Sequence, residues 1–175
     1  MKKQKGFSLI ELLIVVAIIL IIAAIAIPNL LRSKIAANES SAVGSLRTIG
    51  TAEVTYSSSW GTGYAIDLKS LGGPTPCTTA TATSACLIDP LLSVTQVKSG
   101  YSFNAAGTLA DTAGILNGFE INATPTNVQT TGVRSFCDDQ IGIVKFLAAG
   151  TAIGVVAGSC AGIPNAPPAS GPVGN

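Results

Sequence analysis

The sequence predicts an α+β protein in which a long, kinked N-terminal α-helix packs against a small antiparallel β-sheet. Three observations lead to this prediction. An apolar run is followed by an amphipathic helical pattern, a segment rich in Gly, Ser, Thr and Pro ends that pattern, and short runs of alternating polar and apolar residues come last. The length of 175 residues suits one domain with room for one extra element.

The first element is an apolar run from Phe7 to Ile27, preceded by a short basic leader, residues 1–6. At about 1.5 Å per helical residue it spans roughly 31 Å, close to the ~30 Å hydrocarbon layer of a bilayer. A secretory signal also joins a basic and an apolar region, but its apolar region is only about 7 to 15 residues long. We therefore expect 7–27 to cross a membrane, with the leader in the cytoplasm and the remainder on the opposite side.

Pro28 lacks a backbone donor and disfavours helix at the residue before it. Beyond it, however, apolar residues recur at helical steps: Leu30, Leu31, Ile35, Ala42, Leu46, Ile49 and Ala52. This spacing predicts an amphipathic helix over 28–57. One helix, kinked at Pro28, is thus expected from about Phe7 to about Tyr56, and the serines and glycines that follow end it.

Residues 58–99 are predicted to form a variable, exposed loop region with short helical turns at 64–71 and 87–97. Four cysteines lie beyond the apolar run: Cys77, Cys86, Cys137 and Cys160. Their spacing contains no C-x2-C pair, which disfavours zinc and favours disulfides in an oxidising compartment. A local disulfide between the first two would leave the last two to pair. Four cysteines allow three pairings, and free buried thiols are the alternative.

Alternating residues over 100–162 predict an antiparallel sheet of three or four strands, with 138–142 as the turn into the last one. One face would cover the amphipathic helix. The expected core residues are Tyr101, Phe103, Phe119, Ile121, Phe136, Ile143 and Phe146. Residues 153–157 are a candidate edge strand, and the segment 163–175, rich in Pro, Gly and Ala, is predicted to be disordered.

The composition argues against several functions. Histidine is absent, which removes the commonest general base and metal ligand, and the carboxylates are scattered, so we expect no catalytic site, metal or cofactor. Without Lys2, Lys3 and Lys5 the chain carries seven basic and nine acidic residues, a net charge of −2. No basic stripe remains to bind nucleic acid. Hydrophobic residues make up 47% of the chain and charged residues 11%, and the mean hydropathy is +0.52.

Glu11 is the one charged residue inside the apolar run. A centrally placed carboxylate costs about 2.5 to 3.5 kcal/mol on insertion scales, so it calls for a partner. One interpretation is that the side chain reaches the membrane interface. The other is that a cut before Phe7 creates an α-amino group one helical turn away, with which a carboxylate can pair.

The residues from Lys5 to Leu12, KGFSLIEL, resemble the processing site of class III signal sequences, which type IV pilins share with the pseudopilins of type II secretion. The resemblance implies that a membrane aspartyl peptidase cuts after Gly6 and N-methylates Phe7. It also implies that Glu11 sets filament register by pairing with a neighbouring subunit's amine. The sheet residues up to Phe146 are similar to those of pilins and major pseudopilins, whereas the tail from Leu147 departs from them.

The predicted function is that of a bulk type IV pilin, which is held in the inner membrane as a precursor with its C-terminal part in the periplasm and then polymerises into an extracellular filament. The expected partners are copies of itself, the prepilin peptidase, an assembly ATPase and a platform protein. One alternative is a pseudopilin of type II secretion, whose calcium loop Asp138 and Asp139 could contribute to, although a solvated turn is favoured. Another is a minor pilin or adhesin that uses the loop from Gly72 to Ala85.

Overall fold

Helix α1, Leu9–Trp60, is the first element of the computed structural model, which describes residues 7–173. The chain divides into two units, the first ending at Lys34 and the second beginning at Ile35. In the first unit α1 is helical on both sides of Pro28, and nearly every side chain is exposed. A proline inside a helix removes one backbone hydrogen bond, so the remaining bonds can carry the helix past it.

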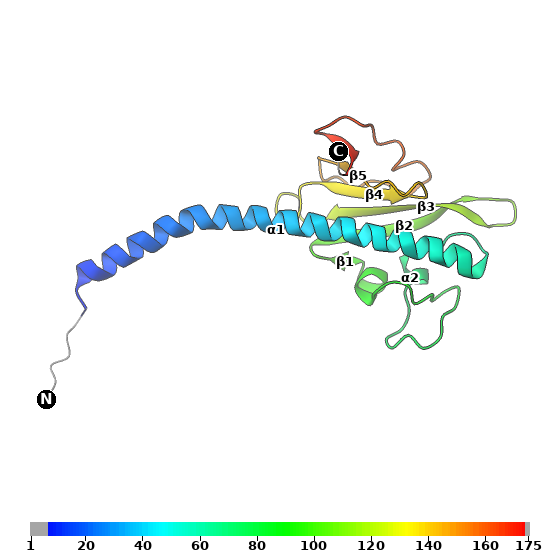
Figure 1. The fold of residues 1–175 in the computed structure, drawn as a ribbon, viewed down its shortest axis with the longest axis horizontal. Helices are drawn as coiled ribbons and strands as arrows, with labels where there is room; N and C mark the ends of the chain where they lie inside the picture. The colour runs from blue at the N-terminus through cyan, green and yellow to red at the C-terminus, as the bar shows by residue number, and fades with distance from the viewer. Residues whose placement is uncertain (1–6, 174–175) are drawn as a thin grey trace. The chain divides into compact units, whose positions relative to one another are not determined.

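The second unit contains a six-stranded antiparallel sheet whose strands follow one another in chain order (Figure 1). The strands are β1, Val97–Lys98; β2, Tyr101–Ala110; β3, Leu116–Pro125; β4, Ser135–Asp139; β5, Lys145–Leu147; and β6, Ser170–Pro172. The long hairpin of β2 and β3 sets the register, with Phe103 opposite Ala123. Two short helical elements, α2 (Leu68–Leu71) and the π-helix η1 (Leu91–Thr95), lie in the connection between α1 and the sheet.

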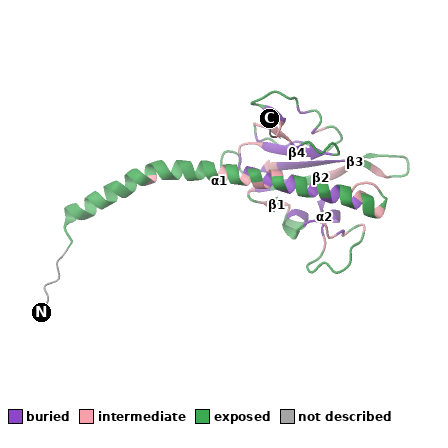
Figure 2. Cartoon of the chain, viewed as in Figure 1, coloured by how far each residue is buried: buried purple, intermediate pink, exposed green. Residues whose placement is uncertain are grey.

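The main core lies between α1 and one face of the sheet. On α1, buried side chains recur at three- and four-residue steps, so they share one side of the helix: Ala42, Leu46, Ile49, Ala52 and Tyr56. They pack against alternate residues of the strands: Tyr101, Phe103, Phe119, Ile121 and Phe136. In Figure 2 the buried residues of α1 lie in its part within the second unit, whereas its N-terminal part is exposed. The predicted fold class, a long helix packed on a small antiparallel sheet, is confirmed.

The other face of the sheet is covered by the segment between β5 and β6. Cys137, Ile153, Cys160 and Ile163 form a second buried cluster there. The Glu120 carboxylate accepts hydrogen bonds from the backbone N–H groups of Gly158 (2.7 Å) and Cys160 (3.0 Å). Because successive residues of a strand point to opposite faces, β3 and β4 contribute to both cores.

The sheet is larger than the sequence predicts. It has six strands rather than three or four because β1 and β6 have two and three residues, too few for an alternating pattern to show. Strand β6 lies in the segment that was expected to be disordered, where Ser170 pairs with Leu147 of β5. Within the described residues no strand forms at 153–157, and Ile153 instead fills the second cluster.

Two predictions about the end of β4 are wrong. Asp138 and Asp139 do not form a solvated turn but are the last residues of the strand, each only 3% exposed. Ile143 is not in the core, because it lies beyond the turn and is 48% exposed. The strand runs two residues further than predicted, which places Asp139 opposite Glu120 and Asp138 opposite Ile121. The longer strand thus buries two side chains that are polar by type.

Candidate functional site

The N-terminal end of α1 carries the two predicted assembly residues that the structure describes. Phe7 precedes the helix and is 79% exposed. One turn further, Glu11 Oε2 accepts a hydrogen bond of 2.9 Å from the backbone N–H of Ser8. This is one half of a capping box, in which a Glu in the first turn satisfies the N–H of the residue that caps the helix. Gly6, the residue before the predicted cut, lies outside the described residues.

This contact was not among the features predicted from the sequence, although the spacing Ser8-x-x-Glu11 is a known sign of a helix start. The donor is the N–H of the Phe7–Ser8 peptide bond, so it remains if the chain is cut before Phe7. Glu11 therefore has a partner within its own chain. A carboxylate accepts several hydrogen bonds, so the same group can still accept one from an amine.

Large apolar side chains surround α1 throughout the first unit. Their exposed fractions run from 46% at Val16 to 78% at Leu9. By length and composition α1 is able to cross a membrane, and the apolar part of it is not buried within the chain. A continuous apolar surface of this size is typical of a membrane-binding or protein-binding region. Pro28 lies within the same helix, and its predicted kink stays a prediction.

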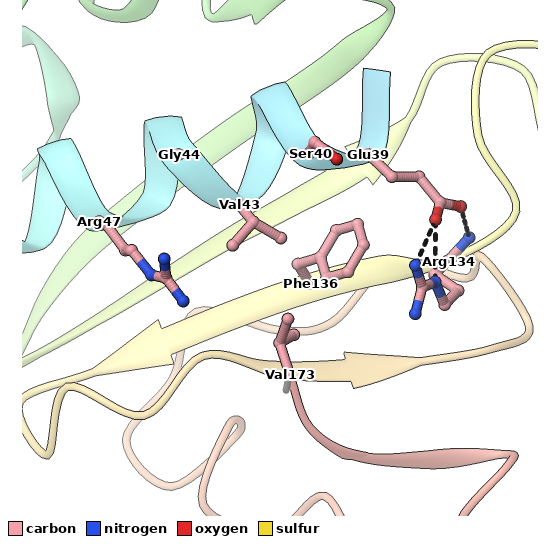
Figure 3. A pocket seen from close by; sticks show the side chains of 8 residues that line it. All are labelled: Glu39, Ser40, Val43, Gly44, Arg47, Arg134, Phe136 and Val173. Carbon is pink, nitrogen blue, oxygen red and sulfur yellow. Dashed lines mark hydrogen bonds and ion pairs between the residues drawn. The ribbon is translucent and has the colours of Figure 1, made fainter. Parts of the chain in front are cut away.

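In the second unit a partly buried ion pair joins α1 to the residue before β4, with the Glu39 side chain 8% and the Arg134 side chain 42% exposed. Glu39 accepts hydrogen bonds from the backbone N–H groups of Val133 (2.9 Å) and Arg134 (3.1 Å) and from the Arg134 side chain through Nε (2.9 Å) and Nη2 (2.7 Å). The Arg134 guanidinium also lies over the rings of Phe136 and Phe146, at 5.5 and 5.4 Å from their centroids. Figure 3 shows the pair at one end of a pocket that reaches Arg47. The sequence contains no local pattern that predicts this ion pair, because its two residues are 95 positions apart.

Glu53 is a buried acid on the same helix. It is fully buried, and its Oε2 accepts a hydrogen bond of 2.8 Å from the backbone N–H of Ala65, which holds the loop after α1. Its Oε1 has no hydrogen-bond partner in the described part of the chain. Burial raises the pKa of Glu53 to about 7, and the nearby charge of Asp67 acts in the same direction.

Two further acids near the end of the sheet are also held in apolar surroundings. Burial raises the pKa of Asp138 to about 6. Burial likewise raises the pKa of Glu120, although the backbone donors of Cys160 and Gly158 work against it. Glu53 and Glu120 thus hold loops in place through backbone donors, whereas the Asp138 carboxylate accepts only the N–H of the next residue.

The structure forms two disulfides, Cys77–Cys86 and Cys137–Cys160, with Cα–Cα distances of 6.0 and 5.7 Å. These are the pairs expected from the sequence. The first closes an exposed loop whose tip is fixed by a 2.6 Å hydrogen bond from the Tyr56 hydroxyl to the Ala82 carbonyl. The second ties β4 to the segment that covers the sheet.

The predicted site residues do not form one cluster. Phe7 and Glu11 lie within one turn at the start of α1, Pro28 lies further along the helix, and the cysteines belong to the second unit. Among residues 7–173 no group of three or more His, Cys, Asp or Glu side chains could hold a metal ion. What the site offers is a charged helix start and a long apolar surface, which suit association rather than reaction.

Comparison with known proteins agrees with a site suited to association. A family described as the prokaryotic N-terminal methylation motif matches residues 1–27. The chain is 62% identical over 39 residues to the type IV wide pilus major component PilA4 of Thermus thermophilus, which covers 22% of the chain and 30% of the relative. It is 46% identical over 54 residues to the type IV major pilin protein PilA of Myxococcus xanthus, which covers 31% of the chain and 24% of the relative.

Both alignments span less than a third of either relative, and no solved structure matches the chain. The likeness to type IV pilins therefore rests on a short stretch of each chain and on the methylation motif at residues 1–27. The α+β architecture, with its long N-terminal helix, agrees with it. In this motif and over these short alignments, the chain is similar to type IV pilins.

Proposed function

We propose that this chain is a bulk subunit of a type IV pilus. The observation that supports the proposal most directly is the first unit of α1, which exposes apolar side chains on all sides behind a methylation motif. Such a helix needs either lipid or other helices around it. In the precursor it would span the inner membrane, with the second unit in the periplasm, and in the filament it would pack among the helices of other subunits.

The steps follow from the N-terminal residues. A prepilin peptidase would cut after Gly6 and methylate the new amino group of Phe7. Glu11 would then pair with the amine of a neighbouring subunit and set the axial register. An assembly ATPase and a platform protein would move subunits from the membrane into the filament. Removing lipid from the apolar side chains of 9–31 and packing them against one another holds the polymer together.

A bulk role is favoured over a minor or adhesive one because the two named relatives are described as a major component and a major pilin, and because Glu11 is present. A pseudopilin of type II secretion has the same N-terminal design. The location of the filament separates the two: a pilus extends from the cell, whereas a pseudopilus stays in the periplasm.

The test uses the bacterium that makes the protein. Filaments sheared from intact cells should contain the chain, and mass spectrometry should show it without residues 1–6 and with one added methyl group on Phe7. A chain that keeps its leader in cells with an active prepilin peptidase would refute the processing step. A processed chain that is confined to the periplasm would refute the pilus and favour the pseudopilin.

A further inference from the structure

A pocket between α1 and the end of β4 contains a carboxylate whose hydrogen bonding is incomplete. The pocket has a volume of about 500 Å³ and lies within the second unit. Its walls include Arg47, Gly50, Val54, Phe119, Asp138 and Gln140. It is open to solvent along the side of α1, and none of the steps proposed above uses it.

Asp138 is the polar group of this pocket. Asp138 is 3% exposed, and its Oδ1 accepts only the backbone N–H of the next residue, at 3.0 Å. Oδ2 receives no hydrogen bond from the residues that the structure describes. It faces Gly50, where a Cβ would lie 3.2 Å away. The glycine therefore leaves room beside this oxygen.

Arg47 lines the same pocket but does not neutralise the acid. Its charge lowers the pKa of Asp138, yet burial outweighs it, and among the described residues the two form no ion pair. Among the described residues Asp138 Oδ2 has no hydrogen-bond donor, and it is not one of the fully buried unpaired atoms, so it can be reached from the pocket. A cation that entered the pocket from outside would supply the missing partner.

The rim of the pocket has the character of a protein interface. Val54 is 55% exposed, and Ile141 and Ile143, on either side of the lining residue Gly142, are 64% and 48% exposed. Apolar side chains around a desolvated polar group are typical of the centre of an interface, where the surrounding contacts exclude water.

The same chain carries cations that fit the pocket. Five basic side chains form no ion pair within the described residues: Arg32, Lys34, Arg47, Lys69 and Lys145. Two of these, Arg32 and Lys34, are exposed and follow the apolar part of α1, the helix through which the chain is proposed to polymerise. In a filament this segment of one subunit lies among its neighbours.

We propose that the pocket at Asp138 receives Arg32 or Lys34 of a second copy of this chain, so that an ion pair joins neighbouring subunits outside the apolar helix core. The contact rests on the proposed function, because it requires a filament. It differs from the pairing at Glu11 in that it joins the helix of one subunit to the sheet unit of another.

Charge-removing variants of the full chain, expressed in the bacterium that makes it, test the contact. Arg32→Gln with Lys34→Gln should reduce sheared filaments several-fold while the amount of subunit in the membrane is unchanged. Lys69→Gln removes another exposed cation and should assemble like the wild type. Wild-type filament yield from the double variant would overturn the proposal.

Asp138→Asn tests the other partner. The raised pKa of Asp138 means that a neutral side chain is tolerated there, so this variant should fold, which the thermal unfolding of the purified chain checks. Its filament yield should fall as in the double variant. A folded variant with normal yield would refute the role of the pocket.

Cross-linking separates this proposal from the general one. Ser33→Cys combined with Gln140→Cys places two exposed thiols beside the proposed partners, and mild oxidation of filaments should then give a ladder of covalent multimers. Ser33→Cys with Thr62→Cys, also both exposed, should give none. Filaments that form without the ladder refute the contact but leave the pilus intact. If the unaltered chain forms no filaments, both proposals fail.

Discussion

The two parts of α1 differ in the type of their side chains and in how far these are buried. From Leu9 to Ile27 the helix is mostly apolar and exposed on all sides, whereas beyond Ile35 even acids such as Glu39 and Glu53 are buried. The second unit covers its own apolar surface with a sheet and satisfies most buried polar groups. The first unit has nothing in the chain to cover it. The difference teaches that one part of the helix serves folding and the other is left for lipid or for other subunits.

Replacing Glu11 should have the largest effect on filament yield and should leave the stability of the second unit unchanged. In Glu11→Ala we expect filaments to be lost or strongly reduced, because the amine of a neighbouring subunit loses its partner. Membrane insertion should be unchanged, since removing a carboxylate lowers the cost of insertion. Filament yield and membrane fractionation measure the two quantities.

Glu11→Gln is the matched control, because the side chain keeps its length and an oxygen that can accept the Ser8 N–H. If only the charge matters, this variant should fail to assemble like Glu11→Ala. Normal filaments from both would remove the register role of Glu11. Lower thermal stability of the second unit in either variant would contradict the independence of the two units.

Removing the disulfide at the sheet should lower the stability of the second unit and leave the first unit unaffected, the opposite of the Glu11 variants. Cys137→Ser with Cys160→Ser should lower the free energy of unfolding by about 3 kcal/mol, the loop-entropy value for the 22 residues enclosed, while membrane insertion stays normal. Cys77→Ser with Cys86→Ser should cost less, because that shorter loop is largely exposed. Denaturant unfolding of the full chain in detergent compares them. If both double variants lose the same free energy of unfolding, the exposure and length of the loop do not decide how much its disulfide stabilises the chain.

The sequence was most informative where a pattern is local. The apolar run, the helical spacing after Pro28 and the alternation in β2 and β3 are periodic over many residues, so the helix, the main hairpin and the shared core could be predicted. Strand β6 and the pair of Glu39 with Arg134 could not, because each depends on residues far apart in the chain. Burial of Asp138 was missed because residue type suggested solvent. The Ser8 cap was predictable and was overlooked.

Glu53 should make the second unit less stable as the pH rises. In the folded chain the pKa of this acid is about 7, against a usual value of 4.5, so the unfolded chain releases its proton first. The contribution of Glu53 to stability is therefore greatest below about pH 4.5 and falls until about pH 7, by about 3 kcal/mol at 1.36 kcal/mol per pKa unit. Unfolding of the full chain in detergent at several pH values would measure the decline.

Glu53→Gln keeps an acceptor for the Ala65 N–H but cannot ionise. Its free energy of unfolding should exceed that of the wild type at pH 8 and depend less on pH. The decline that remains should come from Asp138, whose pKa is about 6, and from Glu120, whose pKa burial also raises. A variant with the same slope as the wild type between pH 6 and pH 7 would contradict the assignment to Glu53.

Replacing two glycines of α1 with alanine should have the smallest effect on stability. These variants also test whether the surface of the second unit contacts other subunits. A Cβ at Gly44 would meet no atom within 4 Å, so Gly44→Ala should raise the free energy of unfolding by about 0.5 to 1 kcal/mol through helix propensity alone. At Gly50 the methyl group would press on Asp138 Oδ2, so Gly50→Ala should gain less. If Gly50→Ala also lowers filament yield while Gly44→Ala does not, the second unit, too, keeps part of its surface for other subunits.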